Sequence, residues 1–115
     1  LRKVTQGISA AFGATATIRY RRGYPVTVNA PDQTRFAAAV ATEIAGADMV
    51  DDAVDPFMGG EDFSYMLQAR PGAYIFLGNG NSTSLHTDTY DFDEAAIPFG
   101  VSYWVRLVER ALPAD

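Results

Sequence analysis

Residues 57–63 read Phe-Met-Gly-Gly-Glu-Asp-Phe, and the rest of the chain is organised around this stretch. Its paired glycines can adopt backbone conformations that other residues avoid, and two carboxylates and a predicted helix start follow them directly. A segment of this kind is typical of a binding loop. Farther along, His86 is the single histidine of the chain and lies in a polar loop after an apolar run. Most of the functional interpretation depends on these two features.

The composition is that of one compact domain. The 115 residues are 48% hydrophobic, which is enough to bury a core. The formal net charge of −5 argues against nucleic acid as a partner, because phosphate binding requires a clustered positive field. One basic cluster, formed by Arg19, Arg21 and Arg22, alternates along a predicted strand. The simplest interpretation is a strand face exposed to solvent.

Several classes of protein are excluded by what this sequence lacks. Without cysteine, disulfide frameworks, thiolate nucleophiles and cysteine-based zinc sites are excluded within this segment. No apolar run approaches the roughly 20 residues that span a bilayer, and no signal-peptide pattern opens the chain. We therefore expect a cytoplasmic protein with no membrane partner. Because the sequence starts at Leu1 rather than at a methionine, we also expect a processed or partial chain.

Apolar residues at steps of three and four predict two helices in the first half of the chain. The first covers residues 1–12 and ends at Gly13, which suits a left-handed terminus. The second is expected to have Asn29 as its cap and Pro31 in its first turn, and to end at Gly46.

Two more helices are predicted downstream. Asp62 is the expected cap of a short helix that starts at Phe63 and is broken by residues 71–72. Asp93 is the expected cap of a long final helix, which carries an apolar face from residue 97 to residue 112. Pro98 is expected to kink this helix near its start.

Strand signals alternate with the helices. Residues 14–21 alternate between apolar and polar side chains, and residues 24–28 look extended, with Pro25 favouring an edge position. A short extended piece is predicted at residues 49–50. Residues 73–77 form a continuous apolar run, as expected of a strand covered on both sides, and a turn-rich loop follows it. Helices and strands in this order indicate an α/β layered fold.

The carboxylates of Glu61 and Asp62 allow two interpretations. Both favour the amino end of a helix through the helix dipole, and Asp62 is expected to serve that purpose alone. Alternatively, Gly59 and Gly60 let backbone amides approach a ligand while Glu61 faces the pocket. The residue types leave both open. A phosphate site is disfavoured, because the loop has no P-loop lysine and is negatively charged.

The imidazole of His86 likewise allows two interpretations. A lone loop histidine is commonly a surface residue or a hydrogen-bonding group. It also follows a predicted buried strand at what would be the carboxyl edge of an α/β sheet, where ligand sites gather, and this position favours a metal or acid–base role. Carboxylates close in sequence that could accept the imidazole N–H are Asp88, Asp91, Asp93 and Glu94, although helix capping is the simpler role for the last two.

Self-contained catalytic sites are not supported. A zinc site needs three or four donors, and here one histidine would be joined by carboxylates alone. The serines 64, 82 and 84 lack the sequence context of a nucleophile elbow. Any chemistry in this segment is therefore only part of a larger site.

Together, these motifs resemble the carboxyl-terminal part of the M20 family of metallopeptidases, in particular the branch of hippurate hydrolases and N-acyl-amino-acid amidohydrolases. The resemblance runs the whole length of the chain but covers only about the last third of a family member. The segments that carry it are residues 58–63 (Met-Gly-Gly-Glu-Asp-Phe), 71–73 (Pro-Gly-Ala), 77–78 (Leu-Gly), 85–87 (Leu-His-Thr) and 90–94 (Tyr-Asp-Phe-Asp-Glu).

The resemblance implies a domain organisation and a set of roles. Residues 1–28 would be the last helix and strand of an α+β lid that mediates homodimerisation, and residues 29–115 part of the layered α/β catalytic domain. His86 would be a ligand of one of two divalent metal ions, zinc, manganese or similar. Gly59, Gly60 and Glu61 would lie beside an N-acyl amino acid or peptide-like substrate, and Asn29 would contact it from the lid junction.

The general-base glutamate and the other metal ligands of the family would lie ahead of Leu1, so the 115-residue chain alone is expected to be inactive. Two alternatives stay open. One is a non-catalytic α/β module that binds a partner or ligand. The other is a small acyl-binding domain with aromatic pocket walls, although such aromatics are more often part of a core. Those walls would be Phe57, Phe63, Tyr65 and Trp104.

Overall fold

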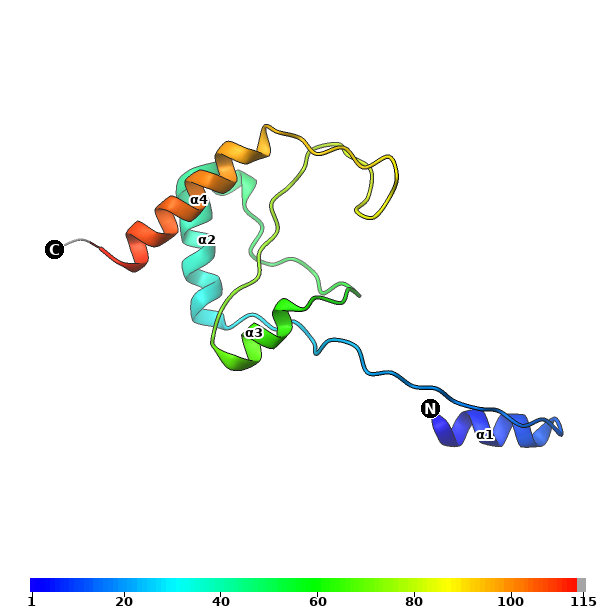
Figure 1. Cartoon of the computed structure of the whole chain (residues 1–115). Coiled ribbons are helices and arrows are strands. Elements are labelled where there is room, and N and C mark those ends of the chain that lie inside the picture. Colours follow the sequence, from blue (N-terminus) through cyan, green and yellow to red (C-terminus); the bar gives the residue numbers. More distant parts are fainter. Residues whose placement is uncertain (114–115) are drawn as a thin grey trace.

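The computed structural model describes residues 1–113, and it is built from helices joined by long extended segments (Figure 1). Helices α2, α3 and α4 lie together with their connecting segments, whereas α1 lies apart at the end of an extended stretch. The elements are α1 (Arg2–Ala11), α2 (Pro31–Ala45), the 3-10 helix η1 (Ala47–Met49), α3 (Phe63–Ala69) and α4 (Ala96–Ala111).

The first two predicted helices are confirmed, with glycine at the end of each. Gly13 follows α1 with a φ of 67°, and Gly46 ends α2 with a φ of 85°, a left-handed region that glycine enters without steric cost. Pro31 occupies the first turn of α2, where its missing N–H is not required. The expected cap is wrong, however, because Ala30 occupies the cap position and Asn29 is engaged elsewhere.

The caps of the two downstream helices also differ from expectation. Asp62 has helical backbone angles and makes no capping bond, whereas Glu61 Oε1 accepts the N–H of Phe63 at 3.1 Å. Asp93 Oδ1 accepts the N–H of Ala95 at 2.9 Å. Ala95, and not Asp93, occupies the cap position of α4, so this bond lies in the turn that precedes the helix. Pro98 is the third residue of α4 and does not interrupt it, since first-turn N–H groups have no partner inside a helix.

The predicted strands are not formed within residues 1–113. Residues 14–21, 24–28 and 73–77 have no ladder hydrogen bonds, and residue 49 ends η1 instead of starting a strand. The physical reason is that a strand requires a neighbour, and no described segment runs alongside these residues in register. Phe76, predicted to be covered on both sides, is 60% exposed. The α/β layering therefore stays a prediction, as does the boundary between residues 1–28 and 29–115, of which residues 114–115 lie outside the described part.

Helices α2 and α4 pack together and form the small core. Val40 of α2 is fully buried, and Ala37 of α2 and Tyr103 of α4 are buried close to it in the same contact. At the edge of the contact Glu43 accepts hydrogen bonds from Arg106, at 2.7 Å, and from Arg110. Because these three side chains are a third to nearly half exposed, the ion pairs orient the helices more than they stabilise them.

Most of the apolar surface of the helices is uncovered. The radius of gyration is 20.6 Å, compared with about 13 Å for a compact domain of 100 residues. No helix in residues 1–113 is long and apolar enough to cross a bilayer. Exposed apolar faces of this extent are typical of interaction surfaces. On α4 they comprise Ile97, Val101, Trp104, Val105 and Val108. On α1 and the residues that flank it they comprise Leu1, Val4, Ile8 and Phe12.

The first prediction concerns this exposed surface. We expect the 115-residue chain, expressed alone, to self-associate, because the apolar faces of α1 and α4 and the unpaired backbone of residues 14–28 are open to a second copy. Light scattering at micromolar concentration measures this directly. Val101→Glu combined with Val105→Glu should reduce the association, while Glu109→Gln on the polar side of α4 should not. A monodisperse monomer of the unsubstituted chain would contradict the prediction.

Candidate functional site

The segment 57–63 is attached at both ends to the extended residues 74–76 by aromatic contacts. The rings of Phe57 and Phe76 lie 5.5 Å apart, and those of Phe63 and Tyr74 also lie 5.5 Å apart. Tyr74 and Phe76 meet edge to face at 5.3 Å, so the four rings form one row. The row fixes the two ends of the segment, and the glycines and Glu61 lie between those ends in the sequence.

Glu61 is the most connected side chain of this segment. Its Oε1 accepts the backbone N–H of Phe63, and its Oε2 accepts the hydroxyl of Tyr74, both at 3.1 Å. Its carbonyl oxygen accepts the hydroxyl of the fully buried Ser64 at 2.6 Å. One carboxylate thus caps α3 and binds a residue of the neighbouring segment.

These hydrogen bonds set the ionisation of both groups. The N–H of Phe63, and after it the Tyr74 hydroxyl, hold the pKa of Glu61 below its ordinary value against the opposing effect of desolvation. Burial, and then the bond to Glu61, raise the pKa of Tyr74 above its ordinary value. Glu61 is therefore an ionised acceptor near neutral pH and a poor proton donor.

The two glycines lie close to aromatic rings and do not adopt a positive φ. Neither Gly59 nor Gly60 is left-handed. A Cβ on Gly59 would lie 2.7 Å from Cε2 of Phe57, and a Cβ on Gly60 would lie 3.3 Å from Cδ2 of Tyr24. A side chain at position 59 would thus displace the Phe57 ring from its contact with Phe76. We expected the glycines to allow unusual backbone angles. The structure shows instead that aromatic rings approach them closely.

Asn29 lies where the extended amino-terminal segment meets α2, and its amide binds the backbone of Tyr74. Its Nδ2 donates to the carbonyl of Tyr74, and its Oδ1 accepts the N–H of Tyr74, both at 2.8 Å. The N–H of Ala30 adds a bond to the carbonyl of Gly72 at 2.9 Å. One donor hydrogen and one lone pair of the Asn29 amide stay free, so the amide has capacity for one more partner.

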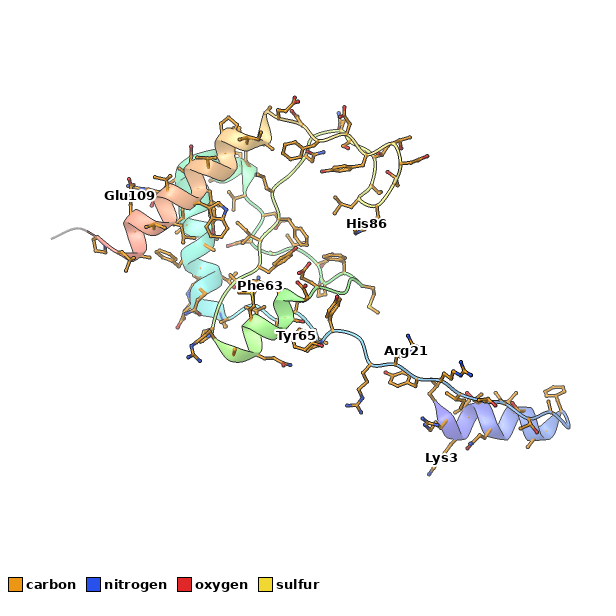
Figure 2. The ribbon with its side chains drawn as sticks, in the orientation of Figure 1. Lys3, Arg21, Phe63, Tyr65, His86 and Glu109 are labelled. Atoms are coloured by element: carbon orange, nitrogen blue, oxygen red, sulfur yellow. The ribbon has the colours of Figure 1, made fainter. Side chains whose placement is uncertain are left out.

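His86 lies at the tip of the loop formed by residues 79–93 and is exposed (Figure 2). Its φ is 64°, a left-handed conformation that is uncommon for a residue with a side chain. Thr87 and Thr83 brace the tip on either side, since the Thr87 hydroxyl donates to the carbonyl of Ser84 and the Thr83 hydroxyl to that of Thr89, each at 2.8 Å. These side-chain hydrogen bonds hold the tip of the loop, and His86 with it, in a defined conformation.

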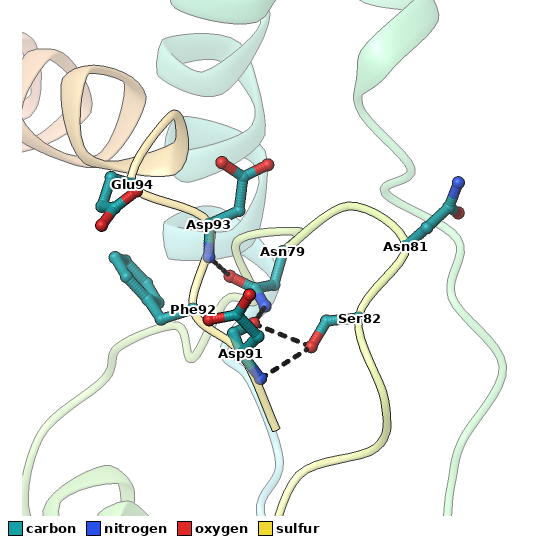
Figure 3. A pocket seen from close by; sticks show the side chains of 7 residues that line it. All are labelled: Asn79, Asn81, Ser82, Asp91, Phe92, Asp93 and Glu94. Carbon is teal, nitrogen blue, oxygen red and sulfur yellow. Dashed lines mark hydrogen bonds between the residues drawn. The ribbon is translucent and has the colours of Figure 1, made fainter. Parts of the chain in front are cut away.

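The base of the same loop borders an open hollow of about 270 Å³ (Figure 3). Asn79 closes it by donating to the carbonyl of Asp91 at 2.7 Å and accepting the N–H of Asp93 at 2.8 Å. The hydroxyl of Ser82 also donates to the carbonyl of Asp91, at 2.8 Å. The role of the polar residues here is to close the loop. The hollow is lined by Asn79, Asn81, Ser82, Asp91, Phe92, Asp93 and Glu94.

The structure brings Glu61, Asn29 and the glycine segment together through Tyr74, and it leaves His86 apart from them in the described residues. Within residues 1–113, no three side chains of histidine, aspartate or glutamate gather closely enough to hold a metal ion. Sequence reasoning missed Tyr74 as the connecting residue. A signal was present, because a tyrosine inside an apolar run has a hydroxyl that requires a partner.

Comparison with known proteins identifies the family. A model of the peptidase family M20/M25/M40 matches residues 3–110, and the chain belongs to this family. It is 31% identical to hippurate hydrolase of Campylobacter jejuni over 96% of this chain and 29% of that relative. It is also 31% identical to the uncharacterized hydrolase SH1513 of Staphylococcus haemolyticus, over 94% of this chain and 29% of the relative.

A third relative is YhaA of Bacillus subtilis, which carries the provisional name of an amidohydrolase. It is 35% identical over 82% of this chain and 25% of its own length. The chain therefore spans less than a third of the length of the relatives that it matches. No solved structure matches the chain. These relatives confirm the resemblance to M20 amidohydrolases that the sequence motifs predicted.

The second prediction follows from the ionisation of Glu61. Because its folded-state pKa is lowered, its hydrogen bonds contribute stability above its ordinary pKa, and this contribution is lost as the pH falls through the lowered value. Glutamate carboxyl ¹³C NMR between about pH 6 and pH 3 should show one resonance that titrates below the ordinary range. That resonance should vanish in Glu61→Gln and persist in the exposed control Glu94→Gln. An ordinary or raised midpoint for Glu61 would contradict the assignment.

Proposed function

We propose that this chain is the carboxyl-terminal part of a metal-dependent amidohydrolase that cleaves N-acyl amino acids or related amides. The observation that carries the proposal is the family match over residues 3–110, together with relatives whose names include hippurate hydrolase and hydrolase. Hippurate is itself an N-acyl amino acid. The chain covers a quarter to a third of these relatives, so the activity is proposed for a longer polypeptide that includes this segment.

This chain would supply one of the ligands that the metal ions of the proposed reaction require. An exposed imidazole held at the tip of a braced loop is a suitable donor for zinc or a similar divalent ion, and we assign this role to His86. The described residues offer no second and third ligand beside it, so the remaining ligands would come from other polypeptide. When bound, two such ions would polarise the substrate carbonyl and lower the pKa of a water molecule.

The residues of this chain would serve substrate binding. Gly59, Gly60 and Glu61 would lie beside the substrate, where the ionised Glu61 suits the amide N–H of an N-acyl amino acid. The exposed rings of Phe57 and Phe76 next to this segment offer an apolar surface for an acyl group. Asn29 would contribute its free donor or acceptor position at the junction with residues 1–28.

We also propose homodimerisation of the intact protein through residues 1–28. The support is the exposed apolar face of α1, which includes Val4 and Ile8, and the unpaired backbone of residues 14–21. A cytoplasmic location is part of the same proposal.

The third prediction tests the assignment of His86. His86→Ala in the complete gene product should lower bound metal and reduce turnover of an N-acyl amino acid at least about 100-fold, because an open ligand position weakens the site. Elemental analysis and steady-state hydrolysis of hippurate measure the two effects. Ser84→Ala, a change in the same loop at a side chain without hydrogen bonds in the described structure, should alter neither. Unchanged metal content and turnover in His86→Ala would refute the role.

A second candidate function is a non-catalytic module that binds a partner or ligand. The observation in its favour is the absence of a three-ligand metal cluster within the described residues.

The fourth prediction separates the two functions. With zinc or manganese supplied, the 115-residue chain alone should show no hydrolysis above background, whereas the complete gene product should hydrolyse N-acyl amino acids. Release of the free amino acid measures the reaction. An inactive complete gene product that still binds partner protein would favour the module. Activity of the chain alone would refute the proposal that the remaining ligands lie outside it.

A further inference from the structure

Tyr74 is the residue at which the contacts of the candidate site meet. Its N–H and its carbonyl are both bound by the amide of Asn29, and its hydroxyl is bound by Glu61. Its ring lies between those of Phe63 and Phe76, at 5.5 and 5.3 Å. Every polar group of Tyr74 therefore has a hydrogen-bond partner, and its ring contacts two other aromatic rings.

The partners of Tyr74 come from separate parts of the chain. Asn29 lies 45 positions away in the sequence, at the start of α2, and Glu61 lies 13 positions away, after the glycines. Tyr74 thus connects the end of the extended amino-terminal segment to the loop that carries Gly59 and Gly60. The continuous hydrogen-bonded path is Asn29 to Tyr74 to Glu61 to the N–H of Phe63.

Apart from the aromatic row at the two ends of the segment, little in the described structure fixes the loop. Residues 51–60 are all exposed, and the outer ring of the aromatic row, Phe57, is 67% exposed. Paired glycines have more conformational freedom than other residues, so a loop that contains them needs an anchor to hold one conformation. The Tyr74 hydroxyl donates to the ionised carboxylate of Glu61 at 3.1 Å, and this contact serves as that anchor.

We propose that Tyr74 is a positioning residue: through its hydroxyl it holds Glu61, and with Glu61 the glycine segment, in the conformation that a substrate meets. Asn29 in turn fixes the backbone of Tyr74, which ties the loop to the junction at residues 28–30. This inference rests on the proposed function, since it takes the glycine segment to lie beside the substrate. Tyr74 itself need not touch the substrate.

The test is Tyr74→Phe in the complete gene product, which removes the hydroxyl and keeps the ring. We expect KM for hippurate to rise about fivefold to tenfold while kcat changes less than about twofold, because a binding surface is loosened and the reacting groups are retained. Hydrogen exchange of peptides covering residues 57–63 should become about tenfold faster. Tyr20→Phe removes an exposed hydroxyl that has no hydrogen bond in the described structure, and it should change neither quantity.

A double substitution separates positioning from a general loss of stability. Glu61→Ala removes this bond and also the bond to the N–H of Phe63, so it should accelerate exchange in residues 57–63 at least as much as Tyr74→Phe does. The double variant should match Glu61→Ala alone, because the bond between Tyr74 and Glu61 is already lost in that variant. Equal acceleration across the whole protein, unchanged exchange in residues 57–63, or additive effects of the two changes would each overturn the proposal. Faster local exchange with an unchanged KM would overturn it as well.

Failure of the proposed function gives a different result. If the unsubstituted complete gene product hydrolyses no N-acyl amino acid, the amidohydrolase proposal is refuted. The exchange measurement still decides whether Tyr74 positions the loop.

Discussion

The pair of hydrogen bonds between the amide of Asn29 and the backbone of Tyr74 is the constraint on which the site depends. It joins residues 45 positions apart, and neither partner belongs to a helix or a strand. Because a side-chain amide presents one donor and one acceptor side by side, it can pair with a backbone segment as a neighbouring strand would. With Tyr74 fixed, the aromatic row and Glu61 have a defined surface to bind, and α3 begins at that surface.

The helices themselves have a different physical basis. Each forms from local apolar spacing, and the most extensive contact between two α-helices in the described residues is that of α2 with α4. The fully buried Val40 and the buried Tyr103 mark that contact, while Trp104 on the next position of α4 is 62% exposed. The described residues thus combine a small native core with large apolar faces suited to further polypeptide, which agrees with a chain that spans less than a third of its relatives.

The candidate functional residues also lie in two separate parts of the chain. The glycine segment, Glu61 and Asn29 are gathered by Tyr74 into one polar and aromatic surface, whereas His86 is presented separately on a braced loop. A divided arrangement of this kind suits a protein whose reaction needs groups from more than one segment. In the proposed amidohydrolase this chain would provide one metal ligand and one part of the substrate surface.

The sequence by itself determined the four helices, the glycines that end the first two, and membership of the M20 family, because periodicity, left-handed glycines and short motifs are local properties. It did not determine the hydrogen-bond partners of Asn29, Glu61 and Asp62. The capping bond expected of Asp62 is made by Glu61, and Asn29 binds Tyr74 instead of capping α2. Nor did the sequence determine whether residues 73–77 would pair as a strand. Those outcomes depend on which distant segment lies within hydrogen-bonding distance, and only the tertiary structure decides that.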